Sequence, residues 1–263
     1  MSKYLLQYSV VGLGFGMNLQ ESLQSGKEGM TLTIISVLGT MLIGWFIGRK
    51  LVKVGSNTSY LISSGTACGG STIAAVGPVI KARVEEMSVT LGTILILNAV
   101  ALFIFPMIGH WLNIDQQQFG TWAAIAIHDT SSVVGAAQAY GEEALKVATT
   151  IKLTRALWII PLILITTGIF KNKGQRISIP WFILFFIAAM IFSTYILSAS
   201  TTGAAIGNAI NVFARKSLII TLFFIGTSIS PDVLKKVDIK PLVQGIILWV
   251  AISLSTLAYI YCR

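Results

Sequence analysis

Four long stretches of the chain contain no aspartate, glutamate, lysine or arginine, and they constrain the fold more than any other feature. They are residues 30–48, 89–111, 179–199 and 241–261. About 20 consecutive apolar residues suffice for a helix to cross the hydrocarbon core of a bilayer. We therefore expect membrane-spanning helices at all four places.

The composition excludes an ordinary soluble protein and disfavours a nucleic-acid-binding one. Hydrophobic residues make up 54% of the 263 positions and charged residues 11%, against about 25% charged in soluble domains. The formal net charge is +9, but the basic residues lie between apolar runs, as in loops beside anionic headgroups. We expect the lipid bilayer, and no nucleic acid, as a partner.

Lysine and arginine also predict the topology. They gather at 49–53, 171–176 and 235–240, which we assign to the cytoplasm. Two shorter apolar runs, 4–18 and 217–230, then run in opposite directions. Arg215 and Lys216 then fall on the outer side of the membrane, as an exception to this rule.

Two further apolar stretches are interrupted by small and polar residues. The stretch 60–80 contains a run of Gly, Ser and Thr around Cys68, and the stretch 120–141 contains His128-Asp129 followed by Thr and Ser. Such residues weaken a helix and free backbone groups, which a membrane tolerates only where protein or water satisfies them.

The chain also resembles itself. Residues 60–111 resemble 120–170, and more weakly 4–48 resemble 217–261. The first two units are antiparallel if each interrupted stretch is a re-entrant hairpin, and parallel if each crosses fully. Transporters commonly combine inverted repeats with broken helices, which favours the hairpin. Chance similarity between apolar segments stays an alternative.

Several motifs together carry a resemblance to a known family. The motifs are Gly14–Leu19, Cys68–Ser71 with Glu85-Glu86, His128-Asp129 with Ser131, Lys152–Arg155 and Ile179–Phe182. In their order and spacing the chain resembles the YeiH-type sulfate exporter family of bacterial inner membranes, over essentially its whole length. Members usually carry further apolar segments before the stretch that matches Met1. Either this chain is a short variant or those N-terminal helices are absent from it, and the first repeat is then incomplete.

The resemblance implies a fold and an activity. The family is grouped with cation–proton antiporters and bile-acid-type sodium symporters. It implies an all-α polytopic protein with inverted repeats and discontinuous or re-entrant helices at the midplane, within one transporter domain, 1–263. It also implies export of sulfate or a related small anion.

The two interruptions are the expected binding site, because glycine lets the backbone approach a ligand and helix N-termini attract anions. Close packing of helices is the alternative. Arg155 can bind an oxyanion in two parallel hydrogen bonds or pair with Asp129. The expected substrate-binding residues are Cys68, Gly69, Gly70, Ser71, Thr72, Thr130, Ser131, Ser132 and Arg155.

Other polar residues receive supporting roles. His128 and Asp129 are expected to bind a coupling H⁺ or Na⁺, since ionisable groups at membrane depth are usually functional, or else Asp129 caps a helix. Lys152 contacts the cavity or extends to the interface. The expected cavity lining is Asn18, Asn98, Lys152, Thr227 and Ser228.

Three functions compete. The first is a secondary anion transporter working by alternating access, with 179–199 and 241–261 in a scaffold apart from both interruptions. The second is a cation/proton antiporter-like carrier that uses Asp129. The third is an intramembrane hydrolase. For it the chain offers His128, Asp129, Ser131 and Cys68 but no GxSxG motif. No GxxxxGK[ST] loop occurs, and we expect no cofactor or metal; a homodimer stays open.

Overall fold

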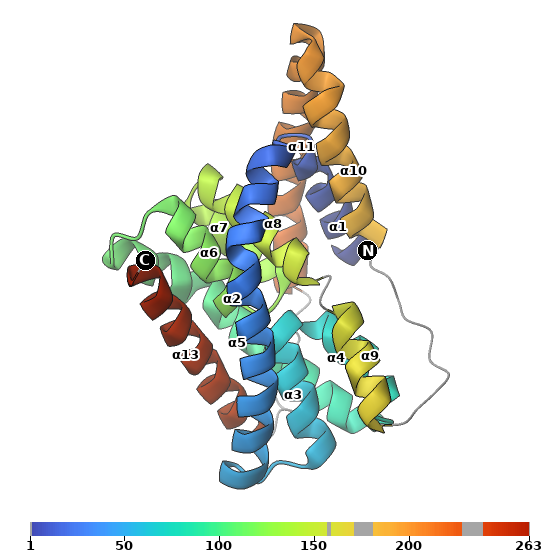
Figure 1. The fold of residues 1–263 in the computed structure, drawn as a ribbon, viewed down its shortest axis with the longest axis vertical. Helices are drawn as coiled ribbons and strands as arrows, with labels where there is room; N and C mark the ends of the chain where they lie inside the picture. The colour runs from blue at the N-terminus through green and yellow to red at the C-terminus, as the bar shows by residue number, and fades with distance from the viewer. Residues whose placement is uncertain (1, 157–158, 171–180, 228–238, 263) are drawn as a thin grey trace. The chain divides into compact units, whose positions relative to one another are not determined.

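The chain folds as an assembly of helices in the computed structural model, which describes residues 2–156, 159–170, 181–227 and 239–262 (Figure 1). Within these ranges every regular element is helical. Three segments are long and apolar enough to cross a membrane: Leu32–Leu51, Val84–Trp111 and Ile239–Tyr261. They confirm three of the four expected spans. The fourth is described only from Trp181, as α10 (Trp181–Tyr195), and is shorter.

The helices group into two compact units. The first unit comprises Met1–Lys27 and Ile179–Ile229, and the second comprises Glu28–Ser178 and Ser230–Arg263. Helix α2 (Leu19–Phe46) begins in the first and continues in the second. Residues 241–261 therefore belong to the unit that holds both interruptions, and the expectation that they share a scaffold with 179–199 is wrong.

In the first unit, α1 (Ser2–Gly14) packs against α10 and α11 (Thr201–Thr227). Helix α11 starts well before the apolar run expected at 217–230, so Arg215 and Lys216 lie within a helix. Small residues let α1 and α11 pack closely, because a Cβ on Gly12 would stand 2.6 Å from the Ala214 Cβ. Asn211 also donates to the Leu13 carbonyl at 3.1 Å.

The second unit is built around α5, the long central helix. In the described part of this unit, α2 is followed by a single π-helical turn at Ile47–Leu51 and eight further helices. These helices are α3 (Ser56–Cys68), α4 (Gly70–Val79), α5 (Val84–Trp111), α6 (Gln116–Ala126), α7 (Thr130–Tyr140), α8 (Glu142–Ala156), α9 (Ile159–Phe170) and α13 (Ile239–Tyr261). At about 1.5 Å per residue, α5 is long enough to cross a bilayer.

In the pair α3–α4, the start of α3 and the end of α4 both lie beside the start of α5. Asn57, in the first turn of α3, donates to the Glu86 carboxylate in the first turn of α5 at 3.4 Å. The end of α4 is joined to the start of α5 by a short turn at Lys81. Because lysines and arginines gather here, we call this end of the second unit the basic end; its members are Lys53, Lys81, Arg83 and Lys240.

In the pair α6–α7, the start of α6 and the end of α7 both lie toward the other end of α5. The Gln116 side chain at the start of α6 accepts a hydrogen bond from the Glu143 amide at the start of α8, at 3.0 Å. Between these points the Tyr140 ring, which ends α7, stacks on Phe119 with centroids 3.7 Å apart. Both α6 and α7 thus have their outer ends beside Trp111, and we call this the far end.

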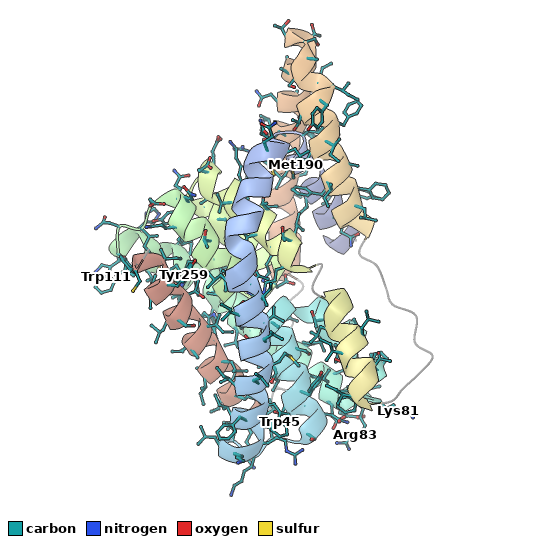
Figure 2. The ribbon with its side chains drawn as sticks, in the orientation of Figure 1. Trp45, Lys81, Arg83, Trp111, Met190 and Tyr259 are labelled. Atoms are coloured by element: carbon teal, nitrogen blue, oxygen red, sulfur yellow. The ribbon has the colours of Figure 1, made fainter. Side chains whose placement is uncertain are left out.

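Aromatic side chains mark both ends of the second unit. Figure 2 shows Trp45 near Lys81 and Arg83 at the basic end, and Trp111 with Tyr259 at the far end. Trp45 and Trp111 are exposed. Amphipathic rings favour the two interfaces of a bilayer, so these belts agree with a membrane whose faces lie at the two ends of α5.

Candidate functional site

The two interruptions predicted from the sequence both exist, and they touch each other. Helix α3 ends at Cys68 and α4 begins at Gly70, while α6 ends at Ala126 and α7 begins at Thr130. A side chain built on Gly69 would stand 2.9 Å from the His128 carbonyl oxygen and 3.2 Å from the Asp129 Cα. The backbones of the two pairs therefore meet at their inner tips.

Only glycine suits position 69. Its φ of +79° and ψ of −167° lie in a region that residues with a side chain rarely enter. The same residue closes α3, since its amide donates to the Gly65 carbonyl at 2.6 Å. Conformation and contact together require the absence of a side chain here.

Asn98 joins the tips to the centre of α5. Its Oδ1 accepts from the amides of His128 at 3.1 Å and Asp129 at 3.3 Å. Asn98 is buried and lies halfway between Val84 and Trp111. The tips thus meet at the level of the middle of α5, the position expected for the midplane of a bilayer.

Two helices begin at this meeting point. Asp129 caps α7, which is one of the two roles that the sequence predicts for it, the other being a coupling-ion site. Its carboxylate accepts a hydrogen bond from the Ser131 amide at 3.0 Å and another from the Ser131 hydroxyl. Helix α4 begins at Gly70 with no side-chain cap on its first turn. The N-terminal ends of α4 and α7 carry partial positive charge, which favours an anion.

The C-terminal end of α6 is held by two buried cations of α8. Lys152 Nζ donates to the Ile127 carbonyl at 2.7 Å and, more weakly, to the Ala124 carbonyl at 3.4 Å. Arg155 Nη1 donates to the Ile125 carbonyl at 2.7 Å. Both side chains are at most 2% exposed. The alternative in which Lys152 extends to the interface is wrong, because the carbonyls freed at Ile127 offer it nearer partners.

Several buried polar atoms in this region have no hydrogen-bond partner among the described residues. They are Thr72 Oγ1, Asn98 Nδ2, both ring nitrogens of His128, and Thr149 Oγ1. Buried polar groups are nearly always satisfied by protein or water. These unused donors and acceptors around the tips are therefore candidates to bind water or a small polar ligand. Thr149 was not expected from sequence, although its spacing of three from Lys152 places both on one face of α8.

Some site residues are accessible and others are not. Asp129, Thr130 and Ser132 are half-buried, whereas Ser131 and His128 are buried. The side chains of Cys68, Ser71 and Thr227 lie outside the description, as does Ser228 altogether. Asn18 lies in the first unit, where it lines a cavity of about 310 Å³ with Thr194 and Asn208.

Metal ligands do not cluster in the described part of the chain. No three His, Cys, Asp or Glu side chains come close enough there to hold an ion. The polar groups that do gather at the tips are amides, hydroxyls, one carboxylate and two cations. That set suits reversible binding of a small ion more than it suits a resident metal.

Comparison with known proteins identifies the family. A family model described as "Conserved hypothetical protein 698" matches residues 1–245. A UPF0324 membrane protein of Bacteroides thetaiotaomicron is 72% identical over 99% of this chain and 78% of its own length. A UPF0324 membrane protein of Porphyromonas gingivalis is 64% identical over 98% of this chain and 78% of its own.

More distant relatives agree. UPF0324 membrane protein VP0936 of Vibrio parahaemolyticus is 50% identical over 100% of this chain and 85% of its own length. No solved structure matches the chain. With a family model that covers most of its length and relatives this similar, the chain belongs to the UPF0324 family of membrane proteins.

Proposed function

We propose that the protein is a secondary transporter that moves a small anion across a bacterial inner membrane by alternating access. The observation that carries the proposal is the contact between Gly69 and the His128-Asp129 backbone. Two interrupted helix pairs that meet halfway along a membrane-spanning helix form the type of site found in many secondary transporters.

The arrangement of the pairs supports an inverted repeat. The pair α3–α4 opens at the basic end and precedes α5, which runs to the far end. The pair α6–α7 opens at the far end and precedes α8, which runs back from it. With α5 spanning the bilayer, the two pairs are re-entrant hairpins from opposite faces, and 60–111 and 120–170 are the two repeats.

The charges at the tips favour an anion as cargo. Lys152 and Arg155 are buried beside the tips, and Asp129 is the carboxylate there that is described. Two helix N-termini add further partial positive charge. This positive charge would attract a bound anion. Sulfate or a related oxyanion, implied by the resemblance to YeiH-type exporters, fits this field.

A cation/proton carrier is the second candidate, and Asp129 favours it. The carboxylate is half-buried at the meeting point and accepts hydrogen bonds only from Ser131 among the described residues. In the anion transporter the same group binds the coupling H⁺ or Na⁺. The two candidates differ in whether ion flux through Asp129 requires an anion.

A hydrolase has weaker support. A serine nucleophile needs its base within hydrogen-bond reach. The Ser131 hydroxyl instead donates to Asp129, and neither ring nitrogen of His128 has a described partner. We therefore propose transport without covalent chemistry.

Counterflow in liposomes tests the proposal. Liposomes containing the purified protein are loaded with unlabelled sulfate, sulfite or methanesulfonate, and entry of radiolabelled sulfate is followed. We expect entry into wild-type liposomes and into those with Gly168→Ala, where the added methyl meets open space, but not into those with Gly69→Ala.

The outcomes separate the candidates. Sodium or proton flux that needs no anion, and stops in Asp129→Asn, would replace the anion transporter by the cation carrier. If wild-type liposomes exchange none of the three anions and no cation, the proposed function is wrong.

A further inference from the structure

A second polar cavity lies at the basic end of the second unit, away from the helix tips. Its volume is about 580 Å³. It lies where α3, α5 and α13 begin, and none of the residues at the tips lines it. The lining residues are Lys53, Val54, Gly55, Thr58, Arg83, Glu85, Glu86, Val89, Ile239, Lys240 and Pro241.

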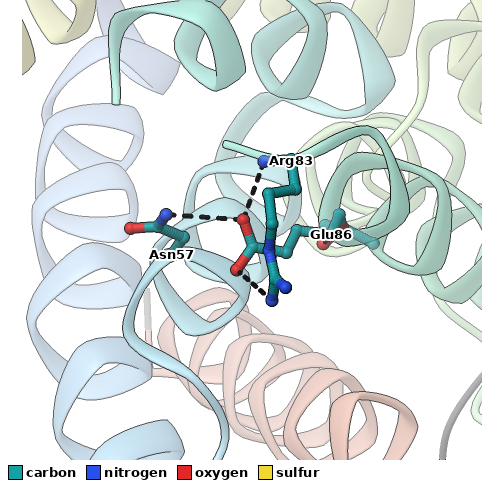
Figure 3. Close-up of polar contacts among 4 residues, drawn as sticks. Asn57, Arg83 and Glu86 are labelled. Carbon is teal, nitrogen blue, oxygen red and sulfur yellow. Dashed lines mark hydrogen bonds and ion pairs between the residues drawn. The ribbon is translucent and has the colours of Figure 1, made fainter. Parts of the chain in front are cut away.

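The charges on the cavity wall divide into a paired set and an available set. Figure 3 shows Glu86 held by Arg83 and Asn57. Its carboxylate accepts from the Arg83 amide at 2.8 Å, the Arg83 guanidinium at 3.3 Å and the Asn57 amide group at 3.4 Å. Glu86 therefore neutralises Arg83 and caps α5. Among the described lining residues this leaves Lys53 and Lys240 with Glu85, a set whose charge is positive.

Two uncharged features of the same wall also favour an anion. Helix α3 begins after Gly55, which supplies no side-chain cap, so its first amides can bind a ligand or water. The Thr58 side chain is only 9% exposed, yet it lines the cavity, and none of the described hydrogen bonds uses its hydroxyl. A mostly buried side chain that lines a basic cavity, and whose hydroxyl has no partner among the described residues, points to a ligand.

The surroundings of the cavity are those of a membrane surface. Leu51, Val84 and Ile239 are 68%, 75% and 79% exposed. Arg49 lies over the Trp45 ring at 5.8 Å, an arrangement suited to the headgroup region. Large apolar side chains exposed around a basic cavity would meet lipid, with the cavity level with the headgroups.

We propose that this cavity binds a phosphate group between Lys53, Lys240 and the start of α3, and that anionic phospholipid supplies it. Basic pockets between membrane helices on the cytoplasmic side are known to bind lipid headgroups. Lys53 and Lys240 belong to the lysine- and arginine-rich segments 49–53 and 235–240, which are assigned to the cytoplasm. A phosphate here would join α3 to α13, which are distant in sequence.

The test compares lipid retention with binding of free phosphate. Wild type, the double variant Lys53→Gln/Lys240→Gln, Glu85→Gln and the control Lys81→Gln are purified. Lys81 lies at the same end but does not line the cavity. Bound phosphatidylglycerol is counted by native mass spectrometry after transfer from nanodiscs of phosphatidylcholine with phosphatidylglycerol. Binding of inorganic phosphate is measured by calorimetry in detergent.

We expect each lysine to contribute about fivefold, so the double variant should bind phosphatidylglycerol about 25-fold more weakly. Lys81→Gln should bind like wild type, and Glu85→Gln more tightly because a repelling carboxylate is gone. If wild type binds inorganic phosphate but retains no phosphatidylglycerol, the cavity is a phosphate site whose ligand is free phosphate and not a lipid headgroup. Equal lipid and phosphate binding by wild type and the double variant would overturn the proposal.

Discussion

The carbonyl oxygen of His128 occupies the space into which a side chain on Gly69 would project, 2.9 Å from the position of its Cβ. Residues 59 positions apart are thus in backbone contact at the inner tips of two helix pairs. Such contact needs glycine, because any Cβ would separate the pairs or force Gly69 out of its φ of +79°.

Gly69→Ala should therefore destabilise the second unit and abolish transport. The backbone conformation alone costs a residue with a side chain about 1–3 kcal/mol, and the overlap with His128 adds to it. Thermal unfolding in detergent measures the loss, with Gly168→Ala as the matched control in open space. Equal melting temperatures for the two variants would show that the tips do not touch in solution.

Asn98→Ala should weaken the link between the tips and α5. The substitution leaves the amides of His128 and Asp129 buried without their acceptor, at a cost of about 1–3 kcal/mol for each. Asn98→Asp keeps an oxygen at that position and should retain more stability than Asn98→Ala. Hydrogen exchange at the two amides checks the cause. Unchanged exchange in Asn98→Ala would contradict the assigned bonds.

Much of the second unit could be predicted from the sequence. The uncharged stretches 89–111 and 241–261 predict α5 and α13, because only a bilayer accommodates so long an apolar helix. The Gly, Ser and Thr cluster at 68–72 and the His128-Asp129 pair predict the two interruptions. Asp129 also predicts the cap of α7 from its residue type and position.

What could not be predicted depends on which partners the fold supplies. From sequence alone, the Lys152 side chain can either extend to the membrane interface or donate to a buried carbonyl. The structure selects the second, because the end of α6 places the Ile127 carbonyl beside it. Helix α11 extends through a polar stretch, and within it Ala214 packs against Gly12, a contact between residues remote in sequence. Hydropathy detects neither relationship.

Lys152→Gln should separate the hydrogen bond from the charge at the end of α6. Glutamine can still donate to the Ile127 carbonyl but carries no charge, so stability should largely remain while affinity for sulfate falls. Lys152→Met removes both and should also cost about 1.5–3 kcal/mol. Sulfate binding by calorimetry and melting temperatures give the two readouts.

The control for Lys152 is Lys146→Gln, on the same helix but partly exposed and paired with Glu143 at 3.8 Å. It should match wild type in both measurements. If Lys152→Gln binds sulfate as tightly as Lys146→Gln does, the positive charge at the tips does not attract the anion.

Gln244→Met should loosen the junction of α2, α3 and α13. The buried Gln244 Nε2 donates to the carbonyls of Gly44 at 2.9 Å and Ser59 at 3.2 Å, and to the Ser59 hydroxyl at 3.1 Å. Methionine keeps the length but no donor, so we expect a loss of about 1–3 kcal/mol. Ser255→Ala on the exposed side of the same helix is the control, and matching unfolding curves would deny Gln244 this role.

Cysteine labelling decides whether the helix pairs are re-entrant. In a Cys68→Ser/Cys262→Ser background, which holds no native cysteine, single cysteines replace Lys53 and Lys81, which flank α3–α4, or Gln117 and Ala139 near the outer ends of α6–α7. Because each pair opens at one end of α5, both members of a set should react with a membrane-impermeant maleimide from one face.

The two sets should react from opposite faces, Gln117→Cys and Ala139→Cys in intact spheroplasts and the lysine positions only in inverted vesicles. The direction follows from the excess of lysine and arginine at the basic end. Opposite accessibility of Lys53→Cys and Lys81→Cys would mean that α3–α4 crosses the bilayer. In that case the repeats would be parallel, and Gly69 could not meet His128 from the opposite face.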